Sequence, residues 1–408
     1  MNSLKPIINR ILENLESWLE VERKKSILFG FDGFLDEIVS VVKIRHSRES
    51  IELMRSMKEW GDRISKAAGS SAGLEVMPKD RRTGGFVANT SQALSSFLHP
   101  VGPFNMIGNF GQPQILPIFS DLFEKQLKCK LFSIGNPGVT NAYEFDDGKI
   151  MMSNFVPVQG NRPELIEKVI HPNSIIEFLN EGGLIGIGYW SITPGMEEIY
   201  QFCQNQIFPK LAHVDQLNIF LDLADIRKKT DADIQRVISL LNSFTDYPAT
   251  TLSLNDREAI RLAVAFGYTQ DEITGSLEAE LPDYFIKLTL FLREHIKFKR
   301  LVIHTPTFAI SSMIDVRNQH VENTIVITIV PNAYTKFPRF TVAAGDTFNA
   351  GLCFGLLVNA TESEDLLLGN ALTSYFIRSG IRGSNHEIRS HLQNYLDYLA
   401  KDTPELLK

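Results

Sequence analysis

Short apolar runs recur along this chain, and most end in a polar or glycine residue before a stretch with helical spacing. Strands of a parallel sheet are buried on both faces, so they are typically near-continuous apolar runs of this kind. Helical segments such as 194–213, 230–243 and 256–266 separate several of the runs. The alternation predicts an α/β fold with a mostly parallel central sheet and helices on both faces. The runs are SILFGFD (26–32), NMIGNFG (105–111), KLFSIGN (130–136), GLIGIGY (183–189), NIFLDLAD (218–225), TTLSLN (250–255) and LVIHT (301–305).

Two regions break this alternation. Residues 43–82 carry many charges and few apolar clusters, and residues 141–158 are typical of a β-hairpin with Asp147-Gly148 at its turn. Neither region fits inside a parallel sheet, so we expect both to form a smaller lobe beside it.

We therefore expect a single domain over residues 1–408, with lid or insertion segments at about 33–82 and 137–160. The first 25 residues alternate polar and apolar side chains at helical spacing and lack a signal-peptide core. We interpret them as an amphipathic helix that packs on the domain.

Composition and charge narrow the class of protein. The formal net charge of −7, from 41 basic and 48 acidic residues, argues against nucleic acid as the main partner. No stretch reaches the roughly 18 apolar residues of a membrane span. Cys129, Cys203 and Cys353 have no metal-ligand spacing and are interpreted as reduced thiols. These features predict a cytoplasmic enzyme or binding protein without a membrane partner.

Polar residues gather where the predicted strands end. In open α/β sheets, ligands bind beyond the carboxyl ends of the strands. Any one of these residues could cap a helix or form a turn, but together they would line one rim of the sheet. The residues concerned are Asp32, Asp36, Gly108 to Gly111, Asp222, Asp225, Asn255, His304 and Thr305.

Two short motifs each allow a structural and a functional interpretation. In TGGFVANTSQAL (83–94), the pair Gly84-Gly85 permits a tight turn or a close approach to a ligand, and Asn89 follows near a helix start. In LSLNDREAI (252–260), Asn255 and Glu258 can form a reciprocal helix cap. The same two side chains could instead reach towards a hydrated Mg²⁺ ion.

The segment RFTVAAGDTFNAGLCFG (339–355) places Asp346 at the start of a largely apolar helix. A carboxylate at such a position is ordinarily a helix cap. Ala344, Gly345 and Asp346, however, offer successive backbone N–H groups at a helix N-terminus, which attracts anions. A base that takes a proton from an attacking hydroxyl, beside donors for a transferring phosphoryl group, accounts for both features. We therefore assign Asp346 as a candidate catalytic base.

These motifs resemble those of the ribokinase-like (PfkB-type) carbohydrate kinases, and they occur in that family's order over roughly residues 26–385. The matching segments are GFDGFLDEIV (30–39), GGFVAN (84–89), NDRE (255–258), AAGDTFNAG (343–351) and NALTSYFIRSG (370–380). The resemblance implies a Rossmann-like sheet with a small lid, and phosphate transfer to a carbohydrate or nucleoside hydroxyl.

The resemblance also implies roles for individual residues. The sugar would contact Asp32, Asp36, Gly84, Gly85, Asn89 and, from the hairpin, Glu144. The nucleotide would lie near Asn255, His304, Thr305, Asn349 and Asn370. Glu258 and Asp222 would serve Mg²⁺, and Ala343, Ala344 and Gly345 would form the anion-binding turn before Asp346.

Some details resemble the ADP-dependent branch of this superfamily. They are the acidic pair Asp32 and Asp36, the segment FLDLAD (220–225) with Asp222 at the acid position, the segment VIHTPTF (302–308), and a helical insertion at 43–82. DTFNAG (346–351) is closer to the ATP-using members, so the donor is expected to be ATP or ADP, with ATP the commoner choice.

Two positions depart from the family pattern. Ala343 replaces the first glycine of the signature, and at a positive φ it would cost about 1 kcal/mol or more. Phe340 replaces an aspartate that is associated with a monovalent-cation site, so we expect no potassium activation by that route.

Three hypotheses follow. The first is an active kinase that uses Mg²⁺ and a nucleotide, as a monomer or a homodimer. The second is a catalytically impaired binding or regulatory protein on the same fold, which Ala343 favours and the retained Asp346 and Glu258 oppose. The third is a dinucleotide-dependent dehydrogenase, which is disfavoured because no G-x-G-x-x-G follows the first strand.

Overall fold

The central element of the protein is a nine-stranded sheet. The computed structural model describes residues 4–407 except 100, 248, 270–280 and 316–323. In that part of the chain the strand order is β14-β13-β12-β11-β10-β9-β1-β5-β6. The neighbours from β12 to β6 pair in parallel, and the antiparallel pairings are those of β13 with β12 and with β14 at one edge. The prediction of a mostly parallel α/β sheet is confirmed.

All seven predicted strands are present, and the two antiparallel edge strands are additional. The strands are β1 (Ser26–Gly30), β5 (Phe104–Gly108), β6 (Lys130–Ser133), β9 (Gly183–Ile187), β10 (Leu217–Asp222), β11 (Thr250–Asn255), β12 (Arg300–His304), β13 (Phe308–Asp315) and β14 (Thr324–Pro331).

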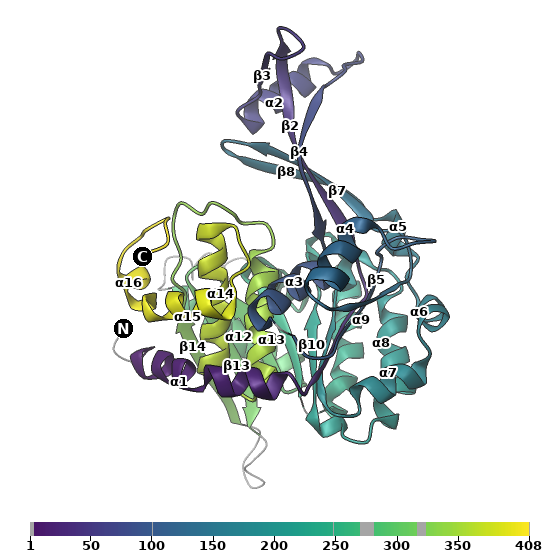
Figure 1. Ribbon diagram of the computed structural model, residues 1–408, viewed down its shortest axis with the longest axis vertical. Helices are drawn as coiled ribbons and strands as arrows, with labels where there is room; N and C mark the ends of the chain where they lie inside the picture. The colour runs from purple at the N-terminus through teal and green to yellow at the C-terminus, as the bar shows by residue number, and fades with distance from the viewer. Residues whose placement is uncertain (1–3, 100, 248, 270–280, 316–323, 408) are drawn as a thin grey trace.

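Helices cover both faces of this sheet (Figure 1). One face is covered by α6 (Pro163–Val169), α7 (Pro172–Leu179), α8 (Met196–Phe202), α9 (Asp231–Asn242), α10 (Asp256–Ala265) and α12 (Leu281–His295). The other is covered by α1 (Leu4–Glu22), α3 (Phe86–Leu98), α13 (Ala344–Leu357), α14 (Glu362–Ser379), α15 (Asn385–Gln393) and α16 (Tyr395–Ala400). Two short helices, α4 (Pro117–Phe119) and α5 (Val156–Gln159), lie in connections.

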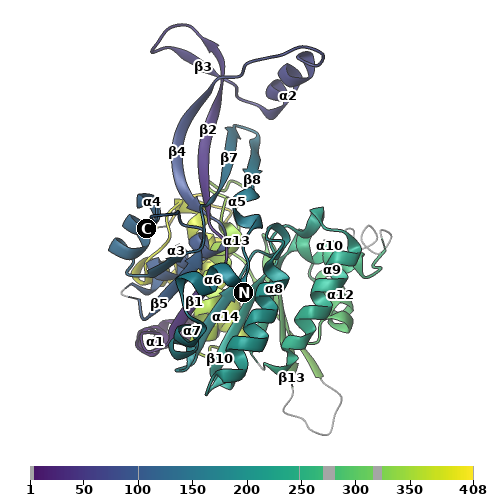
Figure 2. The same cartoon turned by 90° about the vertical axis from the view of Figure 1, so that its right-hand side faces the viewer.

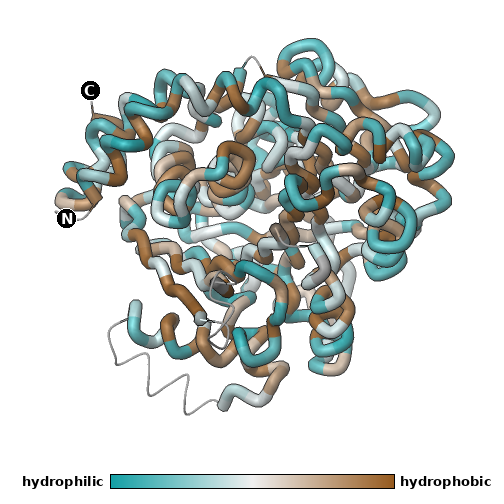
Figure 3. Tube along the Cα trace, turned by 90° about the horizontal axis from the view of Figure 1, so that it is seen from below, coloured by the Kyte–Doolittle hydropathy of each residue, from teal (hydrophilic) through white to brown (hydrophobic). Residues whose placement is uncertain are grey.

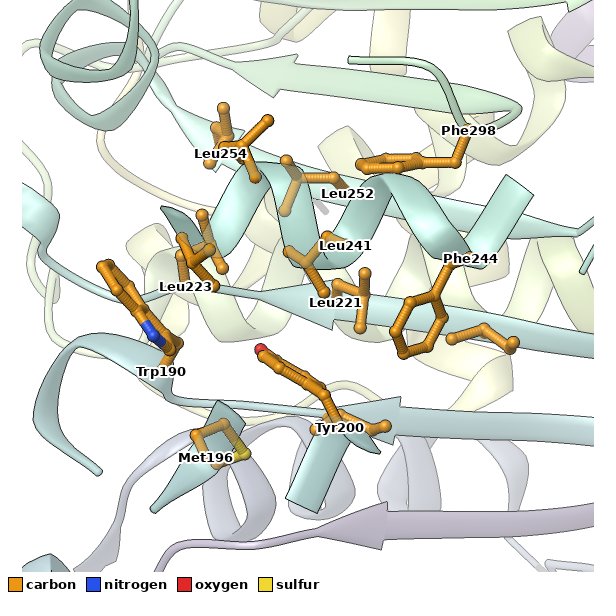
Figure 4. Close-up of a cluster of buried hydrophobic side chains, with 14 of the residues drawn as sticks. Trp190, Met196, Tyr200, Leu221, Leu223, Leu241, Phe244, Leu252, Leu254 and Phe298 are labelled. Atoms are coloured by element: carbon orange, nitrogen blue, oxygen red, sulfur yellow. The ribbon is translucent and has the colours of Figure 1, made fainter. Parts of the chain in front are cut away.

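Alternate residues of each strand belong to different hydrophobic clusters. Leu28 packs in the cluster on the α8 and α9 side, whereas its neighbours Ile27 and Phe29 pack in the cluster on the α3 and α13 side. Figure 4 shows part of the first cluster, where Tyr200 and Leu241 from the helices meet Leu221 from β10. Because both faces are buried, the strands must be apolar throughout, which explains the runs in the sequence.

The N-terminal segment forms an amphipathic helix, as predicted. In α1 the side chains buried against the domain recur at helical spacing, and the alternation of hydrophobic and hydrophilic residues is visible beside the N label in Figure 3. Among the described residues, no helix combines the length and apolar character that crossing a membrane requires. The buried apolar residues of α1 are Leu4, Ile8, Ile11, Leu15 and Leu19.

A second sheet projects from the body, and we call residues 34–84 and 138–154 the arm (Figures 1 and 2). Its long strand β2 pairs antiparallel with β4 and parallel with β7, which pairs in turn with β8. A small core of Val41, Met54 and Trp60 stabilises the far end. The elements are β2 (Phe34–Arg45), β3 (Ile51–Leu53), α2 (Met57–Lys66), β4 (Val76–Gly84), β7 (Gly138–Phe145) and β8 (Gly148–Asn154).

The arm corrects two details of the sequence interpretation. Residues 43–82 are not a mainly helical insertion, because α2 is flanked there by strands of the arm sheet. The predicted hairpin exists, but its two-residue loop is Asp146-Asp147, and Gly148 opens β8 with φ 142°. The pairing of Phe145 with Gly148 sets this register.

Candidate active site

The loop after β1 supplies a carboxylate that holds the start of α3. Asp32 is fully buried, and its two oxygens accept hydrogen bonds of 2.9 Å each from the backbone N–H groups of Phe86 and Val87. These N–H groups lie in the first turn of α3, where they have no partner inside the helix. Asp32 therefore acts as a distant helix cap, and the sugar contact predicted for it stays a prediction.

The glycine pair before α3 lets two carboxylates lie against the backbone. A Cβ atom at Gly84 would lie 2.6 Å from Oδ2 of Asp36. A Cβ atom at Gly85, where φ is 88°, would lie 2.9 Å from Oδ2 of Asp32. Any larger residue at Gly84 would displace the Asp36 carboxylate. The pair thus positions Asp36 on one side and Asp32 on the other.

Asp346 is held by two side chains from distant parts of the fold. The hydroxyl of Tyr189, which follows β9, donates to Oδ1 at 2.8 Å. The amide of Asn89, in α3, donates to Oδ2 at 3.0 Å. Asp346 is only 7% exposed. Each carboxylate oxygen keeps a second lone-pair position, so the group can still accept a proton from a third partner.

The start of α13 has the geometry of an anion-binding turn. Ala343 precedes the helix with φ 64° and ψ 18°, in the left-handed region. Among the described residues, the backbone N–H groups of Gly345 and Asp346 have no hydrogen-bond acceptor. Such a positive φ at Ala343 costs an L-residue about 1–2 kcal/mol.

Burial and neighbouring carboxylates control the charge of Asp346. Burial, and next the charge of Asp222, raise the pKa of Asp346 to about 7, while the donors Tyr189 and Asn89 oppose this rise. Burial also raises the pKa of Asp32 well above its ordinary value, and Asp346 and Asp222 add to that rise. A carboxyl group with a pKa near neutrality is suited to proton transfer.

A second polar cluster lies beyond β10 and β11. Asn349 donates to Oδ2 of Asp222 at 2.8 Å, and Ser253 donates to Oδ1 of Asn349 at 2.8 Å. Asn255 and Glu258 form the reciprocal cap of α10, with bonds of 2.9 and 3.0 Å. Burial, and then Asp222, raise the pKa of Glu258 well above its ordinary value.

Asp222 and Glu258 provide a donor set that suits Mg²⁺ bound largely through water. The charge of Asp222 raises the pKa of Glu258, and a nearby cation would stabilise the ionised forms of both carboxylates. Mg²⁺ favours one or two protein carboxylates together with substrate phosphates and waters. Among the described residues, no group of three or more His, Cys, Asp or Glu side chains could hold a metal ion by itself.

The other residues predicted for the nucleotide have local structural partners. His304 is stacked on Phe348 with the ring centroids 4.7 Å apart, and its ring carbon lies 3.3 Å from where a Cβ of Gly345 would be. The hydroxyl of Thr305 donates to the backbone oxygen of Phe308 at 2.9 Å. Asn370 donates to the backbone oxygens of Val330 and Pro331, and its own side-chain oxygen is buried with no partner in the part of the chain that the structure describes.

A cavity of about 1180 Å³ lies between the arm and the body. Four residues predicted for the site line it, namely Asp36, Asn89, Glu144 and Ala343. Asp346 lies behind this wall, through its bond to Asn89. Asp32, Gly84, Gly85, Ala344, Gly345 and the residues predicted for the nucleotide and metal do not contribute to the lining.

Two cavity residues escaped the sequence interpretation. Arg382 donates from Nη2 to Oδ1 of Asn89 at 3.3 Å, and its guanidinium lies 4.6 Å above the ring of Phe376. Its Nε is buried and has no partner among the residues that the structure describes. Lys149, in β8 of the arm, donates to the hydroxyl of Thr341 at 3.3 Å and so links the arm to the loop before α13. The sequence contained one sign of Arg382, because this residue lies between Gly380 and Gly383, directly after the last segment that matches the family.

Comparisons with known proteins agree with this geometry. Residues 9–395 match the family described as prokaryotic ketohexokinase. The chain is 25% identical to the ketohexokinase of Haloferax volcanii over 374 residues, which covers 91% of this chain and 92% of that protein.

Solved structures share the fold at low identity. Phosphofructokinase-2 of Escherichia coli, in complex with substrates and products, has a TM-score of 0.57 and 15% identity over 92% of this chain and all of that one. The ribokinase of Thermotoga maritima has a TM-score of 0.54 and 15% identity over 91% of this chain and all of that one.

The fold and the site define a ribokinase-like carbohydrate kinase, an enzyme that transfers a phosphoryl group to an alcohol. Within that class, the chain belongs to the prokaryotic ketohexokinase family. The resemblance to ribokinase-like kinases is confirmed, whereas the similarity to the ADP-dependent branch stays a prediction.

Proposed function

We propose that this protein transfers the terminal phosphate of ATP to a hydroxyl of a ketohexose, with Asp346 as the catalytic base. The observation that carries the proposal is the environment of Asp346. Its carboxyl group is buried directly behind the cavity residue Asn89, has a pKa of about 7 because of burial, and lies beside the N–H groups at the start of α13. The ketohexose acceptor is suggested by the Haloferax volcanii relative and by the family.

The cavity residues divide between the two substrates in this proposal. Asp36 and Asn89 accept and donate hydrogen bonds to the sugar hydroxyls, and Glu144 approaches from the arm. Burial raises the pKa of Asp36 to about 6, so the group is largely ionised at neutral pH. It can then accept hydrogen bonds from two hydroxyl groups of the sugar. The arm acts as a lid that excludes water from the sugar.

Proton and phosphoryl transfer take place at the start of α13. Asp346 accepts the proton of the attacking hydroxyl as the new O–P bond forms and the bond to the leaving phosphate breaks. The N–H groups of Gly345 and Asp346 donate to the phosphoryl oxygens, where helix N-termini favour negative charge. The guanidinium of Arg382, beside Asn89, adds a positive charge near the start of α13.

Asp222 and Glu258 would hold a Mg²⁺ ion that neutralises charge on the donor phosphates when it is bound. The side chain of Asn349 orients Asp222 by its 2.8 Å hydrogen bond. The base of the nucleotide would lie towards Asn255, His304 and Thr305. We favour ATP over ADP as donor; among the structural relatives, a ribokinase of Arabidopsis thaliana was solved with ribose and ATP.

A cytoplasmic location, a monomeric or homodimeric state, and the absence of nucleic-acid and membrane partners stay predictions. The same is true of the division into one domain with lid segments. Loss of turnover with retained ligand binding, as in a regulatory protein, is the alternative outcome of the test below.

The test is a measurement of phosphate transfer from Mg-ATP and Mg-ADP to a panel of acceptors. The panel contains D-fructose, D-glucose, D-ribose and adenosine, and each product is identified by mass spectrometry. We expect transfer from ATP to D-fructose at a kcat/KM at least tenfold above that for the other acceptors. Nucleotide binding without transfer to any acceptor would contradict the proposal and favour the regulatory alternative.

A further inference from the structure

We propose that Tyr189 is a positioning residue that holds the carboxyl group of Asp346 in its reactive orientation and keeps it available as a base. This inference rests on the proposed function, because it assigns a partner to the base named there. The inference is supported by a contact that the proposed function does not use. The hydroxyl of Tyr189 lies 2.8 Å from Oδ1 of Asp346, although the two residues are 157 positions apart.

The position of the Tyr189 hydroxyl is fixed by the central sheet and by helix α3. Tyr189 comes two residues after β9, which lies between β1 and β10 in the middle of the sheet. Its ring packs at 5.9 Å from that of Phe86, the first residue of α3. The position of the hydroxyl therefore depends on the packed sheet and helix, and a rigid donor orients a carboxylate better than a mobile one.

Tyr189 and Asn89 each donate to a different oxygen of the Asp346 carboxylate. Tyr189 occupies one lone-pair position of Oδ1, and Asn89 occupies one of Oδ2 at 3.0 Å. Asn89 is itself oriented by Arg382, whose Nη2 donates to its oxygen at 3.3 Å. Rotation of the Asp346 carboxyl group would break both bonds at once. The remaining lone pairs consequently keep one direction, which is the condition for accepting a proton from a bound hydroxyl.

The hydroxyl of Tyr189 must be the donor in this bond. Burial, and then the charges of Asp346 and Asp222, raise the pKa of Tyr189 well above its ordinary value, so the hydroxyl keeps its proton at physiological pH. A neutral donor stabilises an ionised carboxylate more than a protonated one. The bond therefore lowers the pKa of Asp346 relative to the value that burial alone would give.

The other charged and titratable groups around Asp346 come from each neighbouring element. Asp222 at the end of β10 and Asp32 after β1 disfavour its ionised form, whereas Arg382 after α14 favours it. His304 at the end of β12 lies near Gly345, and burial lowers its pKa to about 4, so it is neutral at physiological pH. Tyr189 and Asn89 are thus the two neutral donors that offset the neighbouring carboxylates.

The experiment compares Tyr189→Phe with Tyr200→Phe. Both substitutions remove one buried phenolic hydroxyl, but the hydroxyl of Tyr200 has no hydrogen-bond partner within the described part of the chain. For Tyr189→Phe we expect kcat to fall about 10- to 100-fold with the KM for D-fructose unchanged within about twofold. We also expect the acid limb of the kcat/KM pH profile to move to higher pH. Tyr200→Phe should change neither quantity.

A second variant tests the inference even if Tyr189→Phe fails to fold. Replacement of Tyr189 by 3-fluorotyrosine keeps the hydroxyl and makes it a stronger donor, so the acid limb should move to lower pH. An unchanged acid limb in both variants, or a change in KM alone, would overturn the inference, because a residue that only fills space would not move the pH profile.

Asp346→Asn separates this inference from the proposed function. If Asp346→Asn is inactive while Tyr189→Phe has normal kcat and an unchanged acid limb, the base assignment stands and the role of Tyr189 fails. If Asp346→Asn keeps the wild-type turnover, both fail together.

Discussion

Asn89 and Asp346 are 257 positions apart, yet the side-chain amide of Asn89 donates a 3.0 Å hydrogen bond to Oδ2 of Asp346. The contact joins the helix that follows the glycine pair to the helix that carries the candidate base. It also couples the cavity wall, where Asn89 lies, to a carboxyl group behind that wall. In the proposed function, a sugar that contacts Asn89 would therefore be linked to the orientation of Asp346 through one amide group.

Enlarging Gly84 should damage the sugar site without unfolding the protein. In Gly84→Ala the new Cβ would lie 2.6 Å from the Asp36 carboxylate, which must turn away. We expect the KM for D-fructose to rise about 10- to 100-fold, the range for lost hydrogen bonds to a charged group. Steady-state kinetics will check this, with Gly73→Ala as the control because no atom lies within 4 Å of its added Cβ. An unchanged KM would remove Asp36 from the sugar site.

Relieving the backbone at Ala343 should stabilise the protein. The left-handed φ of 64° is unfavourable for alanine, whereas glycine adopts it freely but loses more chain entropy on folding. We expect Ala343→Gly to raise the free energy of unfolding by about 0.5–1 kcal/mol, measured by urea denaturation. Ala350→Gly, inside α13, should instead destabilise by about 1 kcal/mol or more. Loss of stability in Ala343→Gly would show that the turn does not strain alanine.

The guanidinium of Arg382 should matter for turnover more than for sugar binding. It lies beside Asn89 and Asp346, and its buried Nε has no partner in the described part of the chain. We expect Arg382→Ala to lower kcat about 10²- to 10³-fold with a small change in the KM for D-fructose. Added guanidinium ion should restore part of the rate. Arg339→Ala is the control, because Arg339 also lines the cavity but its side chain is 56% exposed. Equal effects of the two variants would refute a specific role for Arg382.

A buried carboxyl group far from the site should make stability depend on pH. Glu22, at the end of α1, is fully buried; its Oε2 has no partner among the described residues, and burial raises its pKa to about 7 from 4.5. The folded state thus favours the protonated form, and stability falls as pH rises from about 4.5 to 7.

The variant Glu22→Gln removes this titration. We expect it to be about 1–3 kcal/mol more stable than the wild type at pH 8, with the difference disappearing near pH 4.5. Thermal or urea unfolding at several pH values will measure it. Glu20→Gln, which is exposed in the same helix, should show no such dependence. A difference that is the same at all pH values would contradict the assignment.

Local sequence patterns predicted the central sheet well, because burial on both faces leaves a local signature. All seven apolar runs became strands, and the polar residues that follow them lie at one end of the sheet. The arm was harder to predict. Residues 43–82 are rich in charges because much of the arm is exposed, so their pairing with β2 left no apolar pattern to detect.

For the candidate site, the sequence predicted the residues that lie within continuous motifs but not the contacts between motifs. Asp346 and Asn89 lie in recognisable segments, but their hydrogen bond depends on tertiary packing. Tyr189 ends an apolar run and has no local sign of its partner, which is 157 positions away. Asp32 had the chemistry of a ligand contact, and only the structure shows that α3 uses both of its oxygens.

The most direct test of the account is turnover of Asp346→Asn with Mg-ATP and D-fructose, measured beside D-fructose binding by calorimetry. Asparagine keeps the size of the side chain and most of its hydrogen bonding but cannot accept the hydroxyl proton as a base. We predict that kcat falls by about 10³-fold or more while the Kd for D-fructose stays within a few-fold of the wild type. A kcat near that of the wild type would contradict the assignment of Asp346 as the catalytic base.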